Sequence, residues 1–312
     1  MVWNAGFTYE EQLGAAASGR TVLAHMCAAH DHSPESEWRS RLERGEVKLD
    51  GEPASGAELL RPGQWLTWDR PPWDEPDVPR HFELLHEDEA LLAVAKPAGL
   101  PTVPGGGFLE GTLLALVRRD APEASPMHRL GRGTSGLVLF ARTAAARTAV
   151  QAAWRDGGVR KHYRALASGE VGLERFAIDT RIGPVPHPLL GTIHAASPTG
   201  KEARSLVERL EGRAGATLLS VEILTGRPHQ IRIHLAAAGH PLVGDPLYGA
   251  GGGPLPGTVA LPGDCGYLLH AHSLELRHPS SGALITLTCP PPAALATAAE
   301  NAVRLPEGST AV

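Results

Sequence analysis

The 312-residue sequence is poor in cysteine and contains no long apolar run. Its three cysteines, Cys27, Cys265 and Cys289, are far apart, odd in number and free of any C-x-x-C pair. This pattern argues against a disulfide framework and favours a reducing compartment, so we expect a cytoplasmic protein. No apolar stretch reaches the roughly 18 residues that indicate a membrane-spanning helix, and the N-terminal segment lacks the basic and apolar regions of a secretory signal.

An excess of positive charge is also missing. The formal net charge is −5 at pH 7, which excludes a globally basic nucleic-acid-binding protein and restricts any RNA contact to local patches. Hydrophobic residues make up 42% and charged residues 20% of the chain, a balance that predicts a folded core rather than disorder. Glycine (36 residues) and proline (27 residues) are abundant but follow no period, so many tight loops are expected and a collagen-like repeat is excluded.

The first part of the chain is typical of a small α+β module. Within residues 1–70, apolar side chains recur at helical spacing over 21–30 and 34–45. Short strands are expected at 47–52, which enters an Asp-Gly turn, and at 59–68.

The segment 71–82 contains four prolines, and this composition predicts an extended linker. We expect a larger domain over 83–295 and a C-terminal tail over 296–312. Strands follow one another with helices between them and without repeated βαβ units, which predicts an α+β fold with a mainly antiparallel sheet and flanking helices. The strands of this domain are expected at 91–104, where Pro97 and Gly99 break the strand, and at 136–143, 161–171 and 216–226. Its helices are expected at 111–122, 144–157 and 227–240, and a closing hairpin around Ser281 and Gly282.

A polar loop with the sequence HRLGRGTSG (128–136) leads directly into a buried strand. Its three glycines and two arginines favour contact with phosphate groups. It is not a Walker loop, because Gly-Lys-Ser/Thr is absent, and it is not a dinucleotide fingerprint, because it precedes a strand rather than following one. Besides His128 the loop contains no candidate base.

A second polar cluster lies in TGRPHQIRIHL (225–235). On a helix His229 and Arg232 share one face, and Gln230 and His234 lie on a neighbouring face. The two histidines do not have the spacing of a metalloprotease helix and no acid lies between them, so contacts with phosphates and base edges are favoured over zinc. A solvated helix end is the structural alternative.

Two further segments carry weaker signals. Tyr163 lies in KHYRAL between cationic residues and could stack on a nucleobase, although a half-buried strand aromatic is the alternative. Asp245 and Pro246 in GHPLVGDPLYG set a turn, which we interpret as a structural loop.

Taken together these segments resemble the RluA-type pseudouridine synthase family over about residues 83–293. The motifs occur in the order AKPAGLPTVP, HRLGRGTSGLVLFA, RKHYRAL, TGRPHQIRIHLAAAGHPLVGDPLYG and LLHAHSLELRHP. Residues 20–70 are similar to a small RNA-binding module first seen in a ribosomal protein. The resemblance implies an isomerase that flips a uridine of structured rRNA or tRNA, breaks its N1–C1′ bond, rotates the base and forms a C5–C1′ bond, without cofactor or metal.

The resemblance also implies roles for individual residues. Tyr163 would stack on the base, Arg232 would pair with the catalytic carboxylate, and Arg129 would stabilise the space left by the flipped base. His229 and Gln230 would lie near the RNA backbone.

The remaining expected RNA contacts come from the loop and from the front module. Thr134 belongs to the loop, and Arg39, Arg44 and Lys48 are the basic residues of the module. Solvated surface charges are the alternative interpretation of these three. We expect structured RNA as the partner, no membrane, no protein partner and a monomer.

The family's nucleophile is absent from its position. The family pattern is H-R-L-D, and here Gly131 stands in the place of the aspartate. Asp120, Glu123 and Asp245 are the nearest acids, none of them at the matched position, so Arg232 is expected to face an empty place. The loop resembles a branch of the family that carries the same glycine.

Three functions therefore stay open from the sequence. The first is a pseudouridine synthase, and the second is a non-catalytic RNA-binding protein on the same scaffold. The third is a metal-dependent hydrolase that would use His229, His234, His270 and His272.

Overall fold

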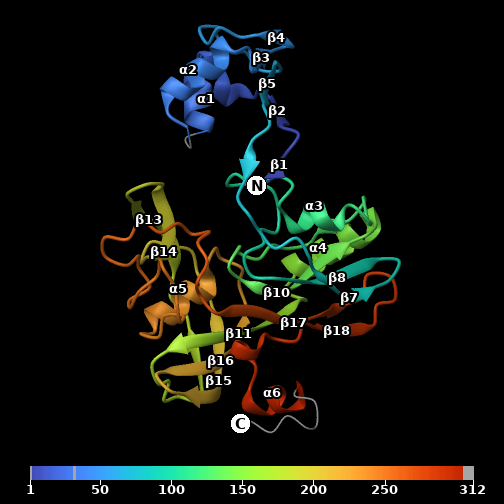
Figure 1. Cartoon of the computed structure of the whole chain (residues 1–312), viewed down its shortest axis with the longest axis vertical. Coiled ribbons are helices and arrows are strands. Elements are labelled where there is room, and N and C mark those ends of the chain that lie inside the picture. The colour runs from blue at the N-terminus through green and yellow to red at the C-terminus, as the bar shows by residue number, and fades with distance from the viewer. Residues whose placement is uncertain (1, 31–32, 305–312) are drawn as a thin grey trace. The chain divides into compact units, whose positions relative to one another are not determined.

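The computed structural model describes residues 2–30 and 33–304 (Figure 1). The chain divides into two compact units, Met1–Asp77 and Val78–Val312. The division lies inside the proline-rich segment 71–82. Part of this segment is not free chain, because strand β6 (Asp74–Glu75) pairs with β1 (Val2–Trp3).

The first unit packs two helices against a four-stranded sheet (Figure 1). Thr21 caps the first helix by accepting a hydrogen bond from the Ala24 amide at 3.2 Å. The core is built around buried Trp38 and Trp68, whose rings meet edge-on at 4.8 Å, with the Arg41 guanidinium over both. The elements are α1 (Val22–Ala29), α2 (Glu35–Glu43) and, in sheet order, β2 (Phe7–Gln12), β5 (Trp65–Arg70), β3 (Val47–Leu49) and β4 (Glu52–Pro53), with a short 3-10 turn η1 (Ala15–Ala17).

The second unit is built on one large sheet whose strands follow the order β12-β15-β16-β11-β17-β10-β8-β7. Strand β18 pairs with β17 and β9 pairs with β10. Among the described strands of this sheet every pairing is antiparallel except that of β10 with β17. The predicted α+β class with a mainly antiparallel sheet is confirmed.

The strands of this sheet are β7 (Glu83–Glu87), β8 (Leu91–Lys96), β9 (Ser125–Pro126), β10 (Ser135–Ala141), β11 (Arg160–Ser168), β12 (Arg175–Ile178), β15 (Ser205–Arg213), β16 (Ala216–Ile223), β17 (Leu269–Arg277) and β18 (Leu284–Thr288). A separate hairpin is formed by β13 (Ile182–His187) and β14 (Gly191–Ala196). The helices are α3 (Leu113–Val117), α4 (Ala144–Arg155), α5 (Gln230–Ala237) and α6 (Ala298–Arg304), with a 3-10 turn η2 (Ala293–Leu295).

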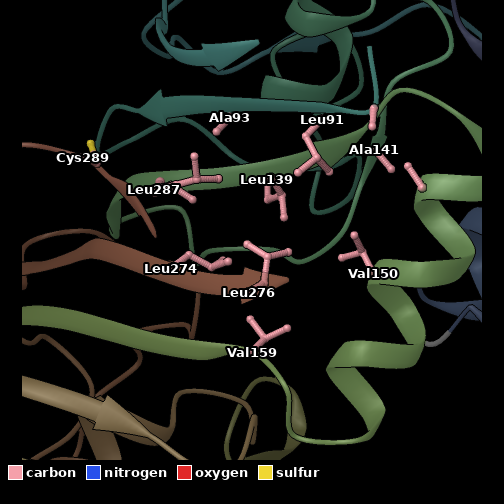
Figure 2. Close-up of a cluster of buried hydrophobic side chains, with 13 residues drawn as sticks. Leu91, Ala93, Leu139, Ala141, Val150, Val159, Leu274, Leu276, Leu287 and Cys289 are labelled. Atoms are coloured by element: carbon pink, nitrogen blue, oxygen red, sulfur yellow. The ribbon is translucent and has the colours of Figure 1, made fainter. Parts of the chain in front are cut away.

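One face of the sheet is covered by α4 (Figure 2). This helix begins where the Thr143 side chain accepts from the Ala146 amide, and it turns Val150 toward the strands. Figure 2 shows Val150 opposite Leu139 of β10 and Leu276 of β17. Burial of such aliphatic side chains is the main driving force for docking the helix, at about 1.5–3 kcal/mol for each.

The predicted elements differ from the observed ones at their ends, and strands β7, β12 and β15 of the large sheet were not predicted. The strand of 91–104 was expected to break at Pro97 and Gly99, and β8 does end at Lys96, because Pro97 lacks the N–H that a ladder needs. The helix expected over 111–122 is only α3, and no strand was expected where the β13–β14 hairpin lies. The expected tail 296–312 contains α6, whose Glu300 accepts from Arg164 at 2.9 Å, while residues 305–312 lie outside the described part.

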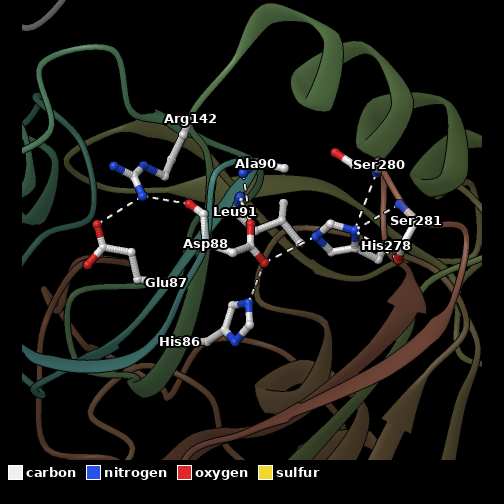
Figure 3. Close-up of polar contacts among 9 residues, drawn as sticks. All are labelled: His86, Glu87, Asp88, Ala90, Leu91, Arg142, His278, Ser280 and Ser281. Atoms are coloured by element: carbon white, nitrogen blue, oxygen red, sulfur yellow. Dashed lines mark hydrogen bonds and ion pairs between the residues drawn. The ribbon is translucent and has the colours of Figure 1, made fainter.

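Asp88 ties the β7–β8 turn to the end of β17 (Figure 3). One carboxylate oxygen accepts from the amides of Ala90 and Leu91, both at 2.8 Å. The other accepts from the Nε2 atoms of His86 at 2.6 Å and His278 at 3.1 Å. Burial alone would raise the pKa of this carboxyl, but the four hydrogen bonds outweigh it and hold the pKa well below its usual range.

We expect Asp88→Asn to lower the free energy of unfolding at pH 7 by roughly 2 kcal/mol, because hydrogen bonds to a charged acceptor are lost. A carboxyl with a depressed pKa stabilises the fold above its unfolded pKa of about 3.9, and this stabilisation disappears as the pH falls toward the folded value. Urea unfolding measures the free energy of unfolding of both proteins. The difference in this free energy between variant and parent should be constant above about pH 5 and should become smaller below about pH 4. The exposed Asp156→Asn is the matched control, and equal losses in both variants would contradict the assigned role.

Candidate active site

A cavity of about 420 Å³ opens in the second unit where the polar loop, β11 and α5 meet. This size lies within the range of ordinary small-ligand pockets. All the site residues that the sequence predicts for this unit line the cavity: Arg129, Gly131, Thr134, Tyr163, His229, Gln230 and Arg232. The structure thus gathers three motifs that are spread over about 100 residues of the chain.

The strand register explains this meeting. The parallel pair of β10 and β17 places Ser135 opposite His270, so the loop before β10 lies beside the segment before β17. Strand β11 pairs with the other edge of β17 and brings Tyr163 opposite Ala271. Three separate stretches therefore reach the same end of the sheet.

Arg232 does not face an empty place, and that expectation is wrong. Its Nε and Nη2 donate to the two carboxylate oxygens of Asp245 at 2.7 and 2.8 Å, and Nη1 donates to the Pro262 carbonyl at 2.8 Å. The side chains of Arg232 and Asp245 are only 2% and 1% exposed. Asp245, interpreted from the sequence as part of a structural turn, thus also neutralises the buried cation.

Asp245 is held too firmly to act as a nucleophile. Besides Arg232 it accepts from the amides of Leu247 at 2.9 Å and Tyr248 at 3.0 Å, and it does not line the cavity. Burial would lower the pKa of Arg232, but the hydrogen bonds that it donates to Asp245 have the larger combined effect and raise this pKa. The guanidinium therefore stays charged. The pair supplies a fixed positive charge beside the cavity.

His128, the candidate base in the loop, is used structurally. Its Nε2 accepts from the Leu139 amide at 3.1 Å, and its ring stacks on Trp154 at 5.2 Å. Burial, with a smaller effect from the Lys161 charge, lowers the pKa of His128 to about 4. The ring is therefore neutral at physiological pH.

The start of α5 is held by a network around Gln230. Its side-chain oxygen accepts from the Thr225 hydroxyl and the Arg227 amide, and its amide nitrogen donates to the Arg204 carbonyl and to Ser205 Oγ. These four partners use the whole amide group, so Gln230 shapes the turn rather than offering itself to a ligand.

His229 precedes α5 with a left-handed backbone (φ 54°), a conformation uncommon for residues other than glycine. Its Nδ1 lies 3.5 Å from Arg232 Nη1. Burial and then the Arg232 charge lower the pKa of His229 to about 4, so the imidazole presented to the cavity is neutral.

Tyr163 projects from β11 into the cavity and is half-buried. Burial raises the pKa of its phenol to about 12, so the ring is uncharged over the physiological range. Such a ring can stack on a nucleobase.

The glycines of the loop make room for Tyr267, which precedes β17. A Cβ atom added at Gly131 would lie 2.9 Å from Tyr267 Oη, and one added at Gly133 would lie 2.9 Å from ring atoms Cε1 and Cζ. Neither glycine has a left-handed backbone. Space, not conformational freedom, therefore favours glycine at both positions, and sequence reasoning did not identify Tyr267 as the cause.

Two further residues were missed as positioning groups. Thr134 was expected to bind RNA, but its buried hydroxyl is 3.2 Å from Tyr267 Oη. Lys96 is 1% exposed, and its Nζ donates to the carbonyls of Pro97, Leu100 and Arg132 at 2.9, 2.7 and 3.3 Å. The sequence signal for this role was Lys96 at the end of the apolar run in AKPAGLPTVP. A lysine buried there needs hydrogen-bond acceptors, and the backbone carbonyls of the neighbouring loops supply them.

The three predicted RNA-binding residues of the first unit are all engaged in ion pairs. Their partners are carboxylates at 2.6 to 2.8 Å: Arg39 with Glu35, Arg44 with Glu46, and Lys48 with Asp69. Arg129 differs, because it is exposed at the cavity and no described carboxylate pairs with it.

The histidines considered as metal ligands have other partners. His234 lies 2.9 Å from both Ser205 Oγ and the Thr180 carbonyl, and His270 lies near Ser135 Oγ and the Cys289 carbonyl. Within residues 2–30 and 33–304, no group of three or more His, Cys, Asp or Glu side chains could hold a metal ion. Over the same residues no helix combines the length and apolar character needed to cross a membrane.

We expect Asp245→Asn to lower the free energy of unfolding by about 3 to 5 kcal/mol, because Arg232 would be left as an uncompensated buried charge. Glu202→Gln is the matched control: it breaks the exposed pair with Arg181 and should cost less than about 1 kcal/mol. Chemical denaturation of both variants measures the difference, and similar small losses would show that the buried pair does not stabilise the fold.

The chain matches the family model described as RNA pseudouridylate synthase over residues 90–237. It is 44% identical to an uncharacterized RNA pseudouridine synthase of Synechocystis sp., with 85% of this chain and 92% of that protein covered. It is 37% identical to RNA pseudouridine synthase 5 of Arabidopsis thaliana, over 96% of each chain. It is also 38% identical to ribosomal large subunit pseudouridine synthase D of Nitrosomonas europaea, over 73% of this chain and 67% of that protein.

A solved structure has the same fold. The human RNA pseudouridylate synthase domain containing 1 superposes with a TM-score of 0.56 at 22% identity, over 74% of this chain and 96% of the human one. The cavity built by the loop, β11 and α5 lies mostly within the matched residues 90–237. From the motifs, the shared fold and relatives of this identity and coverage, the chain belongs to the RluA-type RNA pseudouridine synthase family of isomerases.

Proposed function

We propose that this protein converts a uridine in structured rRNA or tRNA to pseudouridine without a cofactor. The observation that carries the proposal is that one cavity is lined by a neutral aromatic ring, a fixed buried arginine and an exposed arginine. A base to be isomerised must be flipped out of its stack, at a cost of a few kcal/mol, into a pocket that holds it. A cavity of about 420 Å³ is large enough for a nucleobase.

The proposed grip on the uridine divides between stacking and charge. Tyr163 stacks on the uracil ring, and the exposed Arg129 contacts the RNA where the base has left the helix. Lys161 lies at the same rim, where burial lowers the pKa of its ammonium. These local cations supply the attraction for phosphates that the net charge of −5 does not.

We propose ribosomal RNA as one class of substrate, from the name of a relative. One relative carries the ribosomal large subunit in its name, which supports rRNA as a substrate. Recognition of structured RNA depends on shape as much as on base edges, so a folded transcript is the proper substrate for a test.

A second candidate function is RNA binding without chemistry. It is favoured by one observation: the described residues that line the cavity include no aspartate or glutamate. A pocket that kept its stacking and cationic groups but lost the acid would bind RNA and leave it unchanged.

Incubation with folded rRNA and tRNA transcripts in the presence of a chelator distinguishes the two candidates. Chemical mapping of pseudouridine should show turnover beyond one product per enzyme molecule. Tight RNA binding with no product on any transcript would instead establish the binding-only function.

We expect Arg129→Ala to weaken binding to a folded transcript and to reduce the slope of log affinity against log salt by about one, because one phosphate contact is lost. The exposed Arg175 of β12, which pairs with Glu208 of β15, gives the matched control Arg175→Ala and should leave the slope unchanged. Equal slopes for Arg129→Ala and the parent protein would remove Arg129 from the RNA interface.

The contribution of the first unit is tested by changing Arg39, Arg44 and Lys48 together to glutamine. If the module contacts RNA, the variant loses affinity and its salt slope falls by about one for each contact. An unchanged slope would show that the three charges serve only their surface ion pairs.

A further inference from the structure

We propose that Tyr267 is a catalytic residue and supplies the reacting oxygen at the place of the missing aspartate. This inference rests on the proposed pseudouridine synthase function and names the group that carries it out. Tyr267 lines the cavity together with Gly131 and Arg232.

The position of the phenol oxygen carries the inference. A side chain at position 131 would begin with a Cβ atom 2.9 Å from Tyr267 Oη, closer than real Cβ contacts allow. The hydroxyl therefore occupies space that an aspartate at that position would need. An aspartate at position 131 would require the phenol to shift, and in this chain the tyrosine hydroxyl lies where that side chain would begin.

The loop is shaped around the tyrosine ring on two sides. A Cβ at Gly133 would lie 2.9 Å from Cε1 and Cζ of the ring and 3.2 Å from Cys265 Cα. Thr134 Oγ1, at 3.2 Å, fixes the hydroxyl. Gly131, Gly133 and Thr134 thus form one binding site for the Tyr267 side chain.

The electrostatic setting suits a phenol that gains negative charge during a reaction. The guanidinium of Arg232 lies over the Tyr267 ring with Cζ 4.1 Å from its centroid, and the ion pair with Asp245 holds that cation in place. Burial raises the pKa of Tyr267, while the Arg232 charge opposes this rise. The phenol therefore keeps its proton in the resting state, and the Arg232 charge stabilises the phenolate that forms as the proton leaves.

The proposed reaction starts with attack of Tyr267 Oη on C1′ of the flipped uridine. The Oη–C1′ bond forms, the C1′–N1 bond breaks with its electron pair going to uracil, and the phenolic proton moves to N1. Tyrosine acts as the nucleophile at a sugar carbon in some glycosidases, so the chemistry has a physical precedent.

The second half of the reaction restores the enzyme. The released uracil rotates within the cavity, and C5 attacks C1′ while the C1′–Oη electron pair returns to oxygen. The proton on C5 then moves to the phenolate. The result is a C5–C1′ bond, a proton on N1 and a neutral Tyr267, with no other reactant consumed.

The test compares Tyr267→Phe with Tyr248→Phe on a transcript that the parent protein modifies. Tyr248 is the matched control, because its hydroxyl is also buried, donates to the His194 carbonyl at 2.7 Å and does not line the cavity. Tyr267→Phe should lower turnover by about a thousandfold or more with RNA affinity nearly unchanged, the size of loss seen when a nucleophile is removed. Tyr248→Phe should keep turnover within a few fold of the parent.

A pair of substitutions tests whether an aspartate at position 131 and the Tyr267 hydroxyl compete for the same space. Gly131→Asp alone should be poorly active or unstable, because its side chain overlaps Tyr267 Oη. The double variant Gly131→Asp with Tyr267→Phe removes the overlapping oxygen and supplies a carboxylate, and it should turn over at least tenfold faster than Tyr267→Phe.

The outcomes distinguish the role of Tyr267 from the proposed pseudouridine synthase function. If the parent protein and Tyr267→Phe modify RNA at similar rates, the inference about Tyr267 fails and the proposed function stands. If the parent binds RNA but forms no pseudouridine while the double variant does, the proposed function fails, and the inference fails with it.

Discussion

The ion pair between Arg232 and Asp245 is the interaction on which the cavity depends. Two charged side chains are almost completely removed from water, which is costly unless each is fully bonded. Here the guanidinium forms a bidentate pair and also reaches the Pro262 carbonyl, and the carboxylate accepts two backbone amides. The pair thereby joins α5 to the loop that follows it and fixes a positive charge at the cavity wall.

A constraint of space governs the loop that lines the same cavity. The two glycines of the Gly-Arg-Gly sequence in the loop, Gly131 and Gly133, are not required for a left-handed backbone, because neither has a positive φ. They leave room for the ring of Tyr267, which in turn packs against the fixed guanidinium of Arg232. The buried ion pair, the tyrosine and the loop form one continuous arrangement.

Much of this could be predicted from local sequence, and the rest could not for identifiable reasons. The buried run Ser135–Ala141 and the amphipathic run Ala144–Arg155 form β10 and α4 as expected, because periodicity and capping are local properties. The β13–β14 hairpin was missed, since its sequence contains prolines and lacks a clear alternation. Gln230 was expected near the RNA backbone and not as a structural residue, because hydrogen-bond partners such as Arg204 and Ser205 lie 25 or more residues away.

The sequence by itself determined the family, the fold class and the membership of the cavity, because ordered motifs and side-chain periodicity are properties of the chain. Only the tertiary structure decided what Arg232 pairs with and what fills the space beside Gly131. Asp245 and Tyr267 lie 13 and 35 residues from Arg232 along the chain, and a parallel strand pair between β10 and β17 brings Tyr267 to the loop. Such contacts depend on strand register and on close packing, which no local pattern records.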